Sequence, residues 1–241
     1  MLQRDAFIEE ITKKLNQDQN IYFLTADFGA AALDDLRERF PNNFLHCGIA
    51  EQTMLDIAAG LALEGNQVFV YAMAPFLSLR SIEQTKCGAG IMNLPICLLS
   101  VGIGLGYADA GPTHYSTEDF ACFRAIVGSS IYTPADVPST KLIAEDILKH
   151  PKFSYIRLDR DVLPKISPEI TREDFNKGFK IFGQIDDKKI ALISHGKMLH
   201  KCLEIYNNDP NRFFCVDIFR SKPFPVDLPK MVSLCKGIVV V

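Results

Sequence analysis

The sequence lacks the long apolar runs of membrane proteins and the paired cysteines of disulfide-rich secreted proteins. No apolar run approaches the roughly 18 residues that a membrane-spanning helix needs. Residues 1–5 are mostly polar and lead into a helical pattern, so we expect no secretory signal. Seven cysteines are scattered, most of them within apolar runs, and none is spaced as Cys-x-x-Cys: Cys47, Cys87, Cys97, Cys122, Cys202, Cys215 and Cys235. Free thiols of this kind are typical of a reducing compartment, so we expect a cytoplasmic protein.

The sequence also lacks a strong excess of one charge. Its 26 basic and 29 acidic residues give a formal net charge of −3, and both signs are mixed along the chain. Surfaces that bind nucleic acid or anionic membranes concentrate basic residues, so we expect neither as a partner. With 241 residues, of which 48% are hydrophobic, the chain can bury the core of one large domain and part of a second.

Short apolar runs alternate with helical patterns along the first two thirds of the chain. Runs of strand length lie at residues 21–24, 44–46, 68–71, 96–101, 130–133 and 153–158, and helical patterns at residues 4–15, 30–40, 51–63, 75–92, 117–126 and 136–149. This alternation predicts an α/β fold, in which a doubly wound parallel sheet of about six strands occupies residues 1–160.

The last third of the chain predicts a linker and a second unit. Residues 161–178 hold two prolines and mixed charges with little periodicity, which predicts a linker. Residues 179–241 again alternate strand and helix patterns and end in an apolar strand, which predicts a second, smaller α/β domain. Because no helix pattern follows that strand, we expect this domain to be incomplete or to be covered by another chain.

Two short motifs stand out from the alternating pattern. Gly48-Ile49-Ala50-Glu51-Gln52 places a carboxylate at the start of a helix, where it can be an ordinary cap or dipole partner. Gly111-Pro112-Thr113-His114 follows the predicted strand 96–101 on a glycine-rich loop. Ligands gather at the carboxyl ends of parallel strands, so an imidazole there is a candidate for proton transfer. Asp27 also follows a strand, and it can be a site residue or a helix cap.

Five motifs together resemble the pyrimidine-binding domain of transketolases. They are Asp27 in Thr-Ala-Asp-Phe, residues 48–52, Phe76 with Arg80, residues 111–114, and Leu158-Asp159-Arg160, and they occur in the family's order. The resemblance covers residues 4–160, and the remaining residues resemble the first half of the transketolase C-terminal domain. It implies an enzyme that uses thiamine diphosphate to transfer a two-carbon ketol unit from a ketose donor to an aldehyde acceptor.

The resemblance implies which residues face the cofactor. Glu51 would hydrogen-bond the aminopyrimidine ring and activate the cofactor, and Phe76 would stack on that ring. Asp27 and Arg80 would also lie against the cofactor. Phe76 can alternatively be a core aromatic residue.

The resemblance also implies which residues face the substrate. His114 would hydrogen-bond the donor sugar and move protons as the carbon–carbon bond breaks, unless it is only a structural hydrogen-bonding group. Arg160 would bind a substrate phosphate, although a surface ion pair with Asp159 or Asp161 explains it equally simply. Asp109 would read a substrate hydroxyl, because Ala110 stands where transketolases usually carry an acidic residue.

The chain departs from the family in ways that affect the prediction. It has no Gly-Asp-Gly motif, with which the family holds Mg²⁺ and the diphosphate. We therefore expect no metal ligands here, and a separate N-terminal subunit that binds Mg²⁺ and the diphosphate, in a heterotetramer of two plus two. Gly29-Ala30-Ala31 also lacks the family's phosphate-binding hydroxyls, which favours an unusual sugar or sugar phosphate.

Three other interpretations stay open. The chain can be a deoxyxylulose-phosphate-synthase-like protein or a 2-oxo-acid dehydrogenase β-type subunit, because Gly-Ile-Ala-Glu-Gln also occurs in those proteins. Gly-Pro-Thr-His argues against the dehydrogenase subunit. A non-catalytic, transketolase-like partner protein is the alternative of another class, and the presence of Glu51 and His114 speaks against it.

Overall fold

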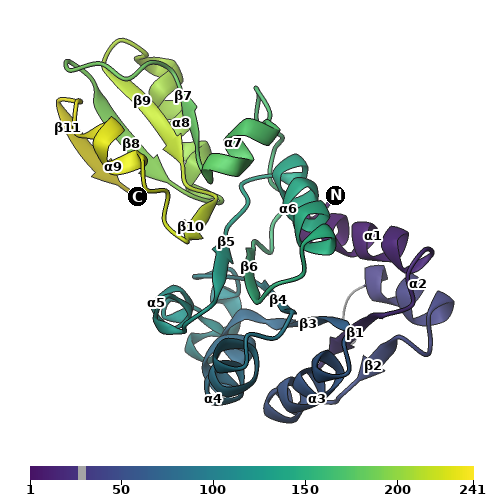
Figure 1. The fold of residues 1–241 in the computed structure, drawn as a ribbon. Coiled ribbons are helices and arrows are strands. Elements are labelled where there is room, and N and C mark those ends of the chain that lie inside the picture. Colours follow the sequence, from purple (N-terminus) through teal and green to yellow (C-terminus); the bar gives the residue numbers. More distant parts are fainter. Residues whose placement is uncertain (27–30) are drawn as a thin grey trace.

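The computed structural model describes residues 1–26 and 31–241, which form two sheets with their helices (Figure 1). Within the described residues the larger sheet has the strand order β10-β5-β6-β4-β3-β1-β2. Its strands are β1 (Ile21–Thr25), β2 (Phe44–His46), β3 (Gln67–Met73), β4 (Ile96–Val101), β5 (Ser130–Tyr132), β6 (Ser154–Leu158) and β10 (Arg220–Lys222). All pairs are parallel except β10 with β5. The predicted doubly wound α/β fold is confirmed, with six strands before residue 160.

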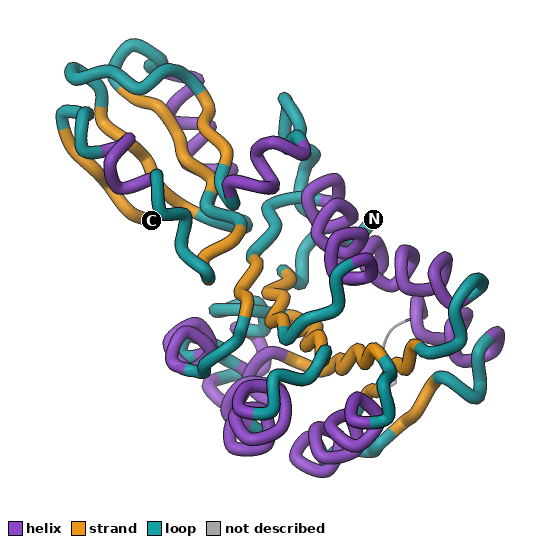
Figure 2. Tube along the Cα trace, in the orientation of Figure 1, coloured by secondary structure: helices purple, strands orange, loops and turns teal. Residues whose placement is uncertain are grey.

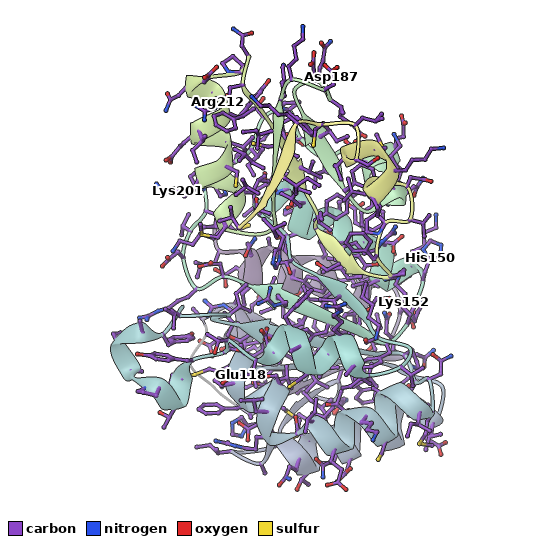
Figure 3. The ribbon with its side chains drawn as sticks, turned by 90° about the vertical axis from the view of Figure 1, so that its left-hand side faces the viewer. Glu118, His150, Lys152, Asp187, Lys201 and Arg212 are labelled. Carbon is purple, nitrogen blue, oxygen red and sulfur yellow. The ribbon has the colours of Figure 1, made fainter. Side chains whose placement is uncertain are left out.

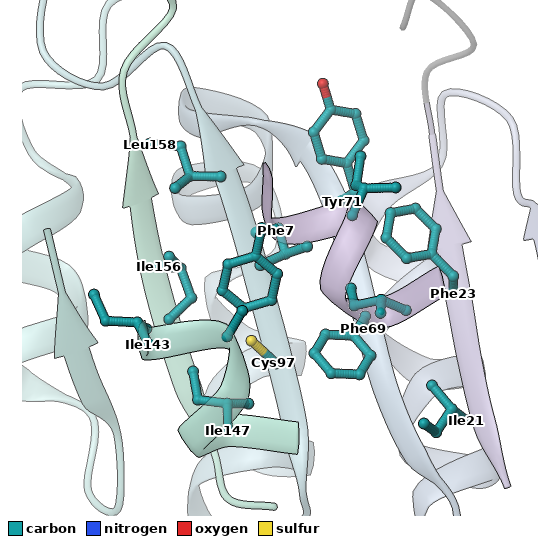
Figure 4. Close-up of a cluster of buried hydrophobic side chains, with 14 of the residues drawn as sticks. Phe7, Ile21, Phe23, Phe69, Tyr71, Cys97, Ile143, Ile147, Ile156 and Leu158 are labelled. Atoms are coloured by element: carbon teal, nitrogen blue, oxygen red, sulfur yellow. The ribbon is translucent and has the colours of Figure 1, made fainter. Parts of the chain in front are cut away.

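Helices cover both faces of this sheet because side chains alternate along each strand. One face packs against α1 (Gln3–Leu15), α2 (Ala31–Arg39) and α6 (Val137–Lys149). The other packs against α3 (Glu51–Leu63) and α5 (Asp119–Ala125). Figure 1 shows α1 beside α6, and Figure 4 shows Phe7 of α1 among strand side chains such as Phe69 and Cys97.

The helix that the sequence predicts over residues 75–92 forms, but it is largely a π-helix. It consists of η1 (Phe76–Arg80), the short α4 (Ile82–Gln84) and η2 (Thr85–Ile91). η2 lies close to its neighbours: a Cβ added to Gly90 would lie 2.7 Å from a methyl carbon of Ile126. π-helical turns are rare and occur frequently at functional sites.

The second unit is a smaller sheet with the order β11-β8-β9-β7 in the described part of the chain (Figure 2). Its elements are β7 (Lys180–Phe182), β8 (Ile190–Ser194), α8 (Met198–Asn208), β9 (Phe213–Asp217), α9 (Leu228–Val232) and β11 (Gly237–Val240). α8 packs against one face and α9 against the other. Figure 3 shows Asp187 and Arg212 at the end of this unit that lies farther from the larger sheet.

Two segments join the units. Helix α7 (Arg172–Lys177) forms inside the predicted linker, capped by Thr171 and Asp174. Strand β10 belongs by sequence to the predicted second domain, yet it pairs with β5 and completes the larger sheet. Lys222 of β10 also donates hydrogen bonds to the Arg124 carbonyl (3.0 Å) and the Ser129 hydroxyl (2.8 Å). The domain limits at residues 160 and 179 stay a prediction.

Candidate active site

Glu51 is the first residue of α3, and its side chain is buried with only 2% exposed. Gly48 precedes it with φ 71°, a left-handed turn that an L side chain rarely adopts. The helix has no side-chain cap at Ala50. The free backbone N–H groups of its first turn favour a negative charge there. The fold therefore holds a carboxylate in the interior, close to the carboxyl end of β2.

Arg80, at the end of η1, makes the ion pair with this buried carboxylate. Its Nη1 donates a hydrogen bond of 2.6 Å to Glu51 Oε2. The same guanidinium lies over the ring of Phe76, with 4.2 Å from Cζ to the ring centroid. Both residues come from one π-helical turn. The structure thus brings together Glu51, Phe76 and Arg80, three of the four residues that the resemblance implies for the cofactor side.

His114 meets this group from the loop after β4. Its imidazole lies edge-to-face with Phe76, with 5.3 Å between ring centroids. The loop is closed by two hydrogen bonds between Gly104 and Ser116, of 3.0 and 2.8 Å. His114 ends the short 3₁₀ turn η4 (Pro112–His114), and its Nδ1 is 3.0 Å from the Thr113 hydroxyl.

Tyr107 connects His114 to the remaining predicted residues. Its ring centroid is 6.4 Å from that of His114, and the Arg160 guanidinium lies 4.5 Å over its ring. Arg160 Nη1 donates a 2.6 Å hydrogen bond to Asp109, which lowers the pKa of the Asp109 carboxyl below its ordinary value. The position of Tyr107 depends on Gly102 (φ 77°), because a Cβ there would lie 2.1 Å from its ring.

The contacts form one series from Glu51 through Arg80, Phe76, His114 and Tyr107 to Arg160 and Asp109. Arg160 pairs with Asp109, not with Asp159 or Asp161 as the simple surface interpretation supposes. Asp27 lies outside the described residues. Among those described, no group of three or more His, Cys, Asp or Glu residues could hold a metal ion.

A buried polar network beneath the loop was not anticipated from the sequence. Arg157 on β6 donates to both oxygens of Asp119, at 2.8 and 3.1 Å, and the Tyr155 hydroxyl donates to the same carboxylate at 2.9 Å. Burial raises the pKa of the Tyr155 hydroxyl, and the charge of Asp119 adds to this effect. The available signal was Arg157 itself, because an arginine inside an apolar strand needs a buried anion.

A cleft of about 420 Å³ lies between the glycine-rich loop and the second unit. Its walls include Gly104, Arg157 and His195, the last of these on the loop between β8 and α8. Burial, together with the nearby positive charge of Arg157, lowers the pKa of His195 to about 4. His195 is therefore neutral at pH 7.

The part of the chain that the structure describes has no helix with the length and apolar character to cross a membrane. Comparisons with known proteins identify the family of the chain. A family model of the transketolase pyrimidine-binding domain matches residues 1–165. The chain belongs to this family. The transketolases named below are similar to it in sequence or in fold.

Two curated relatives are subunits of transketolases. An apulose-4-phosphate transketolase subunit of Phocaeicola vulgatus is 34% identical over 164 residues, covering 68% of this chain and 53% of that protein. A 6-deoxy-6-sulfo-D-fructose transketolase subunit of a Clostridium species is 29% identical over 176 residues, covering 73% of this chain and 54% of that protein. The chain thus spans about half the length of these relatives.

The fold matches that of transketolases over both units. A solved structure described as a split gene transketolase, inactive beta4 tetramer, superposes with a TM-score of 0.84. It covers 100% of this chain and 79% of that chain at 24% identity, so it supports the fold alone. The predicted pyrimidine-binding fold type, with a second and smaller α/β unit, is confirmed.

Proposed function

We propose that this chain is the pyrimidine-binding subunit of a two-subunit transketolase-type enzyme. In this proposal it works with a separate subunit that holds Mg²⁺ and the diphosphate of thiamine diphosphate. The observation that carries the proposal is the series of contacts from buried Glu51 to exposed Arg160, which joins the family's motifs into one surface. Membership of the transketolase family and the two relatives named as subunits support it.

The residues present fit the pyrimidine half of the cofactor. A buried carboxylate offers an acceptor for a ring N–H, and the half-buried ring of Phe76 beside it offers an apolar face on which a flat heterocycle can stack. When bound, thiamine diphosphate supplies a nucleophilic carbon for chemistry next to a carbonyl group. Glu51 would hold the proton shared with the ring, and burial in the first turn of α3 would keep water away from that proton.

The substrate side is proposed to take a sugar that carries an anionic group. His114 is half-buried, so part of its imidazole is open to a substrate. An imidazole can accept and return a proton at a substrate hydroxyl or carbonyl. Arg160 is exposed at the other end of the series, and its planar guanidinium suits a phosphate or sulfonate. The names of the two relatives refer to a sugar phosphate and a sulfo-sugar. Asp109 would hold Arg160 in position and accept a hydrogen bond from a sugar hydroxyl.

The assembly is proposed to contain two copies of each subunit. A cofactor held by two different subunits needs at least one of each, and closed two-fold assemblies are the commonest arrangement. Deoxyxylulose-phosphate synthase-like and dehydrogenase β-type activities are less well supported, because both relatives described above are transketolase subunits.

The proposal is tested by producing this chain with a subunit that carries the Gly-Asp-Gly motif. The pair should bind thiamine diphosphate by calorimetry, whereas the chain alone should bind it weakly. Glu51→Gln should lower turnover by at least about 100-fold while assembly, measured by light scattering, stays intact. Asp56→Asn on the exposed side of the same helix is the matched control and should leave turnover unchanged. Turnover by E51Q near the wild-type level would contradict the proposal.

A further inference from the structure

The guanidinium of Arg80 makes two contacts at once. It is a flat, cationic group that lies over the ring of Phe76 at 4.2 Å, and it donates an N–H to Glu51 Oε2 at 2.6 Å. In the part of the chain that the structure describes, Arg80 is the side chain that pairs with this buried carboxylate. A cation over an aromatic face and a charge-assisted hydrogen bond are both favourable, and they reinforce one another here.

These are the same two contacts that the proposed function requires of the cofactor's aminopyrimidine. That ring is also flat, would stack on Phe76, and would give an N–H to Glu51. Two flat groups cannot lie over the same face of one ring at once, so the guanidinium and the aminopyrimidine exclude each other on Phe76. We propose that Arg80 is an internal competitor of the pyrimidine ring, which must swing away from Glu51 and Phe76 before the cofactor can bind.

The burial of Glu51 explains what Arg80 does in the absence of the cofactor. Glu51 is 2% exposed, and an ionised carboxylate buried without a partner is strongly unfavourable. Arg80 neutralises it and so stabilises the helix start before the cofactor arrives. The Arg80 side chain is itself 40% exposed, so water can solvate its charge when it rotates outward and leaves these two contacts. The next residue, Ser81, has φ −114° and ψ 23°, so the regular helix is already interrupted there.

This inference rests on the proposed function. It predicts that removing Arg80 changes the cofactor affinity in the opposite direction from removing a simple cofactor ligand. If Arg80 held the bound cofactor, its removal would weaken binding. If Arg80 competes with the cofactor, its removal strengthens binding, because the cofactor no longer has to displace an ion pair. When part of the molecules is in a competing state, the apparent affinity for the cofactor falls in proportion to the fraction that remains free to bind it.

The test measures thiamine diphosphate affinity by calorimetry in the assembled pair. Arg80→Met keeps an unbranched apolar stem but removes the charge and the flat fork, and it should bind the cofactor about tenfold more tightly than wild type. Arg80→Lys keeps a charge for Glu51 and should fall between the two. Arg39→Met is the matched control, because Arg39 also lies over a ring (Phe40, 5.3 Å) and pairs with a carboxylate (Asp35, 3.1 Å) away from the site. R39M should bind as wild type.

A second measurement uses the chain alone with thiamine as the probe, followed by NMR chemical shifts. R80M should again bind more tightly than wild type and R39M equally. Equal or weaker binding by R80M in either experiment overturns the competition. Glu51→Gln separates the two ideas by turnover, because its binding would also change through the lost ion pair with Arg80: if E51Q in the pair turns over near the wild-type level, the proposed function fails whatever Arg80 does. If E51Q loses turnover and R80M binds thiamine diphosphate no better than wild type, only the competition fails.

Discussion

The ring of Phe76 and the imidazole of His114 lie edge-to-face with 5.3 Å between their centroids, although they come from different layers of the fold. Phe76 begins the π-helical turn after β3, and His114 ends a turn in the loop after β4. Strands β3 and β4 are parallel neighbours, so their carboxyl ends open at the same edge of the sheet. This contact places the proposed cofactor-facing and substrate-facing residues on one surface.

Replacing Phe76 should therefore affect His114 as well as the cofactor. Phe76→Leu keeps an apolar side chain but removes the ring contact, which for aromatic pairs contributes about 0.5–1.5 kcal/mol. We expect the imidazole proton resonances of His114 to shift in the NMR spectrum of the chain alone. In the assembled pair, turnover should fall by about tenfold or more as the imidazole loses its orientation.

Phe224→Leu is the control for this change, because Phe224 is exposed and lies beyond the site residues in the second unit's loop. It should leave the His114 resonances and turnover unchanged. Identical His114 resonances in F76L and wild type would show that the ring contact does not hold the imidazole.

The fold could be predicted from the sequence because buried apolar residues recur with the period of each strand or helix. Every strand of the large sheet before residue 160 appears as a short apolar run, and the helices between them show their own period. In β3, Phe69 and Tyr71 face one helix layer while Val68 and Val70 face the other. Such two-sided burial is typical of parallel strands. Glu51 and His114 were proposed as site residues because each belongs to a short motif that can be read locally.

Contacts between segments that are distant in the sequence could not be predicted from it. Nothing local to Arg220–Lys222 shows that β10 pairs with β5, because three half-buried residues carry no strand pattern. The ion pair of Arg80 with Glu51 depends on the π-helical winding of η1, which changes the face on which Arg80 lies. The place of Tyr107 between His114 and Arg160 follows from the closed loop and not from spacing.

The buried pair of Asp119 and Arg157 should be the most sensitive ion pair in the larger unit. Asp119 is completely buried and accepts from Arg157 and Tyr155. Asp119→Asn leaves the arginine buried without a counter-charge, which typically lowers the free energy of unfolding by about 3–5 kcal/mol. Urea denaturation of the chain alone measures this change.

A double variant distinguishes charge burial from lost packing. Asp119→Leu together with Arg157→Met removes both charges, so it should recover most of the stability that D119N loses. Glu118→Gln on the neighbouring exposed residue should change stability by less than about 0.5 kcal/mol. A double variant less stable than D119N would contradict this account.

Gly102 should tolerate no side chain, for two separate reasons. Its φ of 77° lies in the left-handed region, and an added Cβ would meet the Tyr107 ring at 2.1 Å. We expect Gly102→Ala to displace Tyr107 and to lower stability by about 2–4 kcal/mol, combining backbone strain with overpacking. Thermal unfolding of the chain and the amide spectrum of residues 104–116 report these effects.

Gly65→Ala isolates the contribution of backbone strain to the predicted loss of stability. Gly65 has φ 89°, but an added Cβ meets no atom within 4 Å, and the residue lies in the turn before β3. G65A should therefore cost only about 1 kcal/mol and leave the loop spectrum unchanged. If G102A were no more destabilising than G65A, the contact with Tyr107 would not constrain the loop.

His195 should make the chain less stable in mild acid. Its pKa is about 4 in the folded protein and 6.5 ordinarily, because burial and the positive charge of Arg157 disfavour the protonated ring. Between these values the unfolded chain binds more protons than the folded chain, so the free energy of unfolding falls as pH falls from about 6.5 to about 4. Full protonation would remove up to about 3 kcal/mol.

The effect is measured as the difference between wild type and His195→Gln in urea denaturation from pH 7.5 to pH 4. Taking the difference cancels the titration of groups common to both chains, including the buried Asp217, whose pKa burial raises. H195Q should lose less stability than wild type over this range, and it should show no such advantage above pH 7. Parallel curves for H195Q and wild type would mean that His195 is protonated in the folded chain as readily as in the unfolded one.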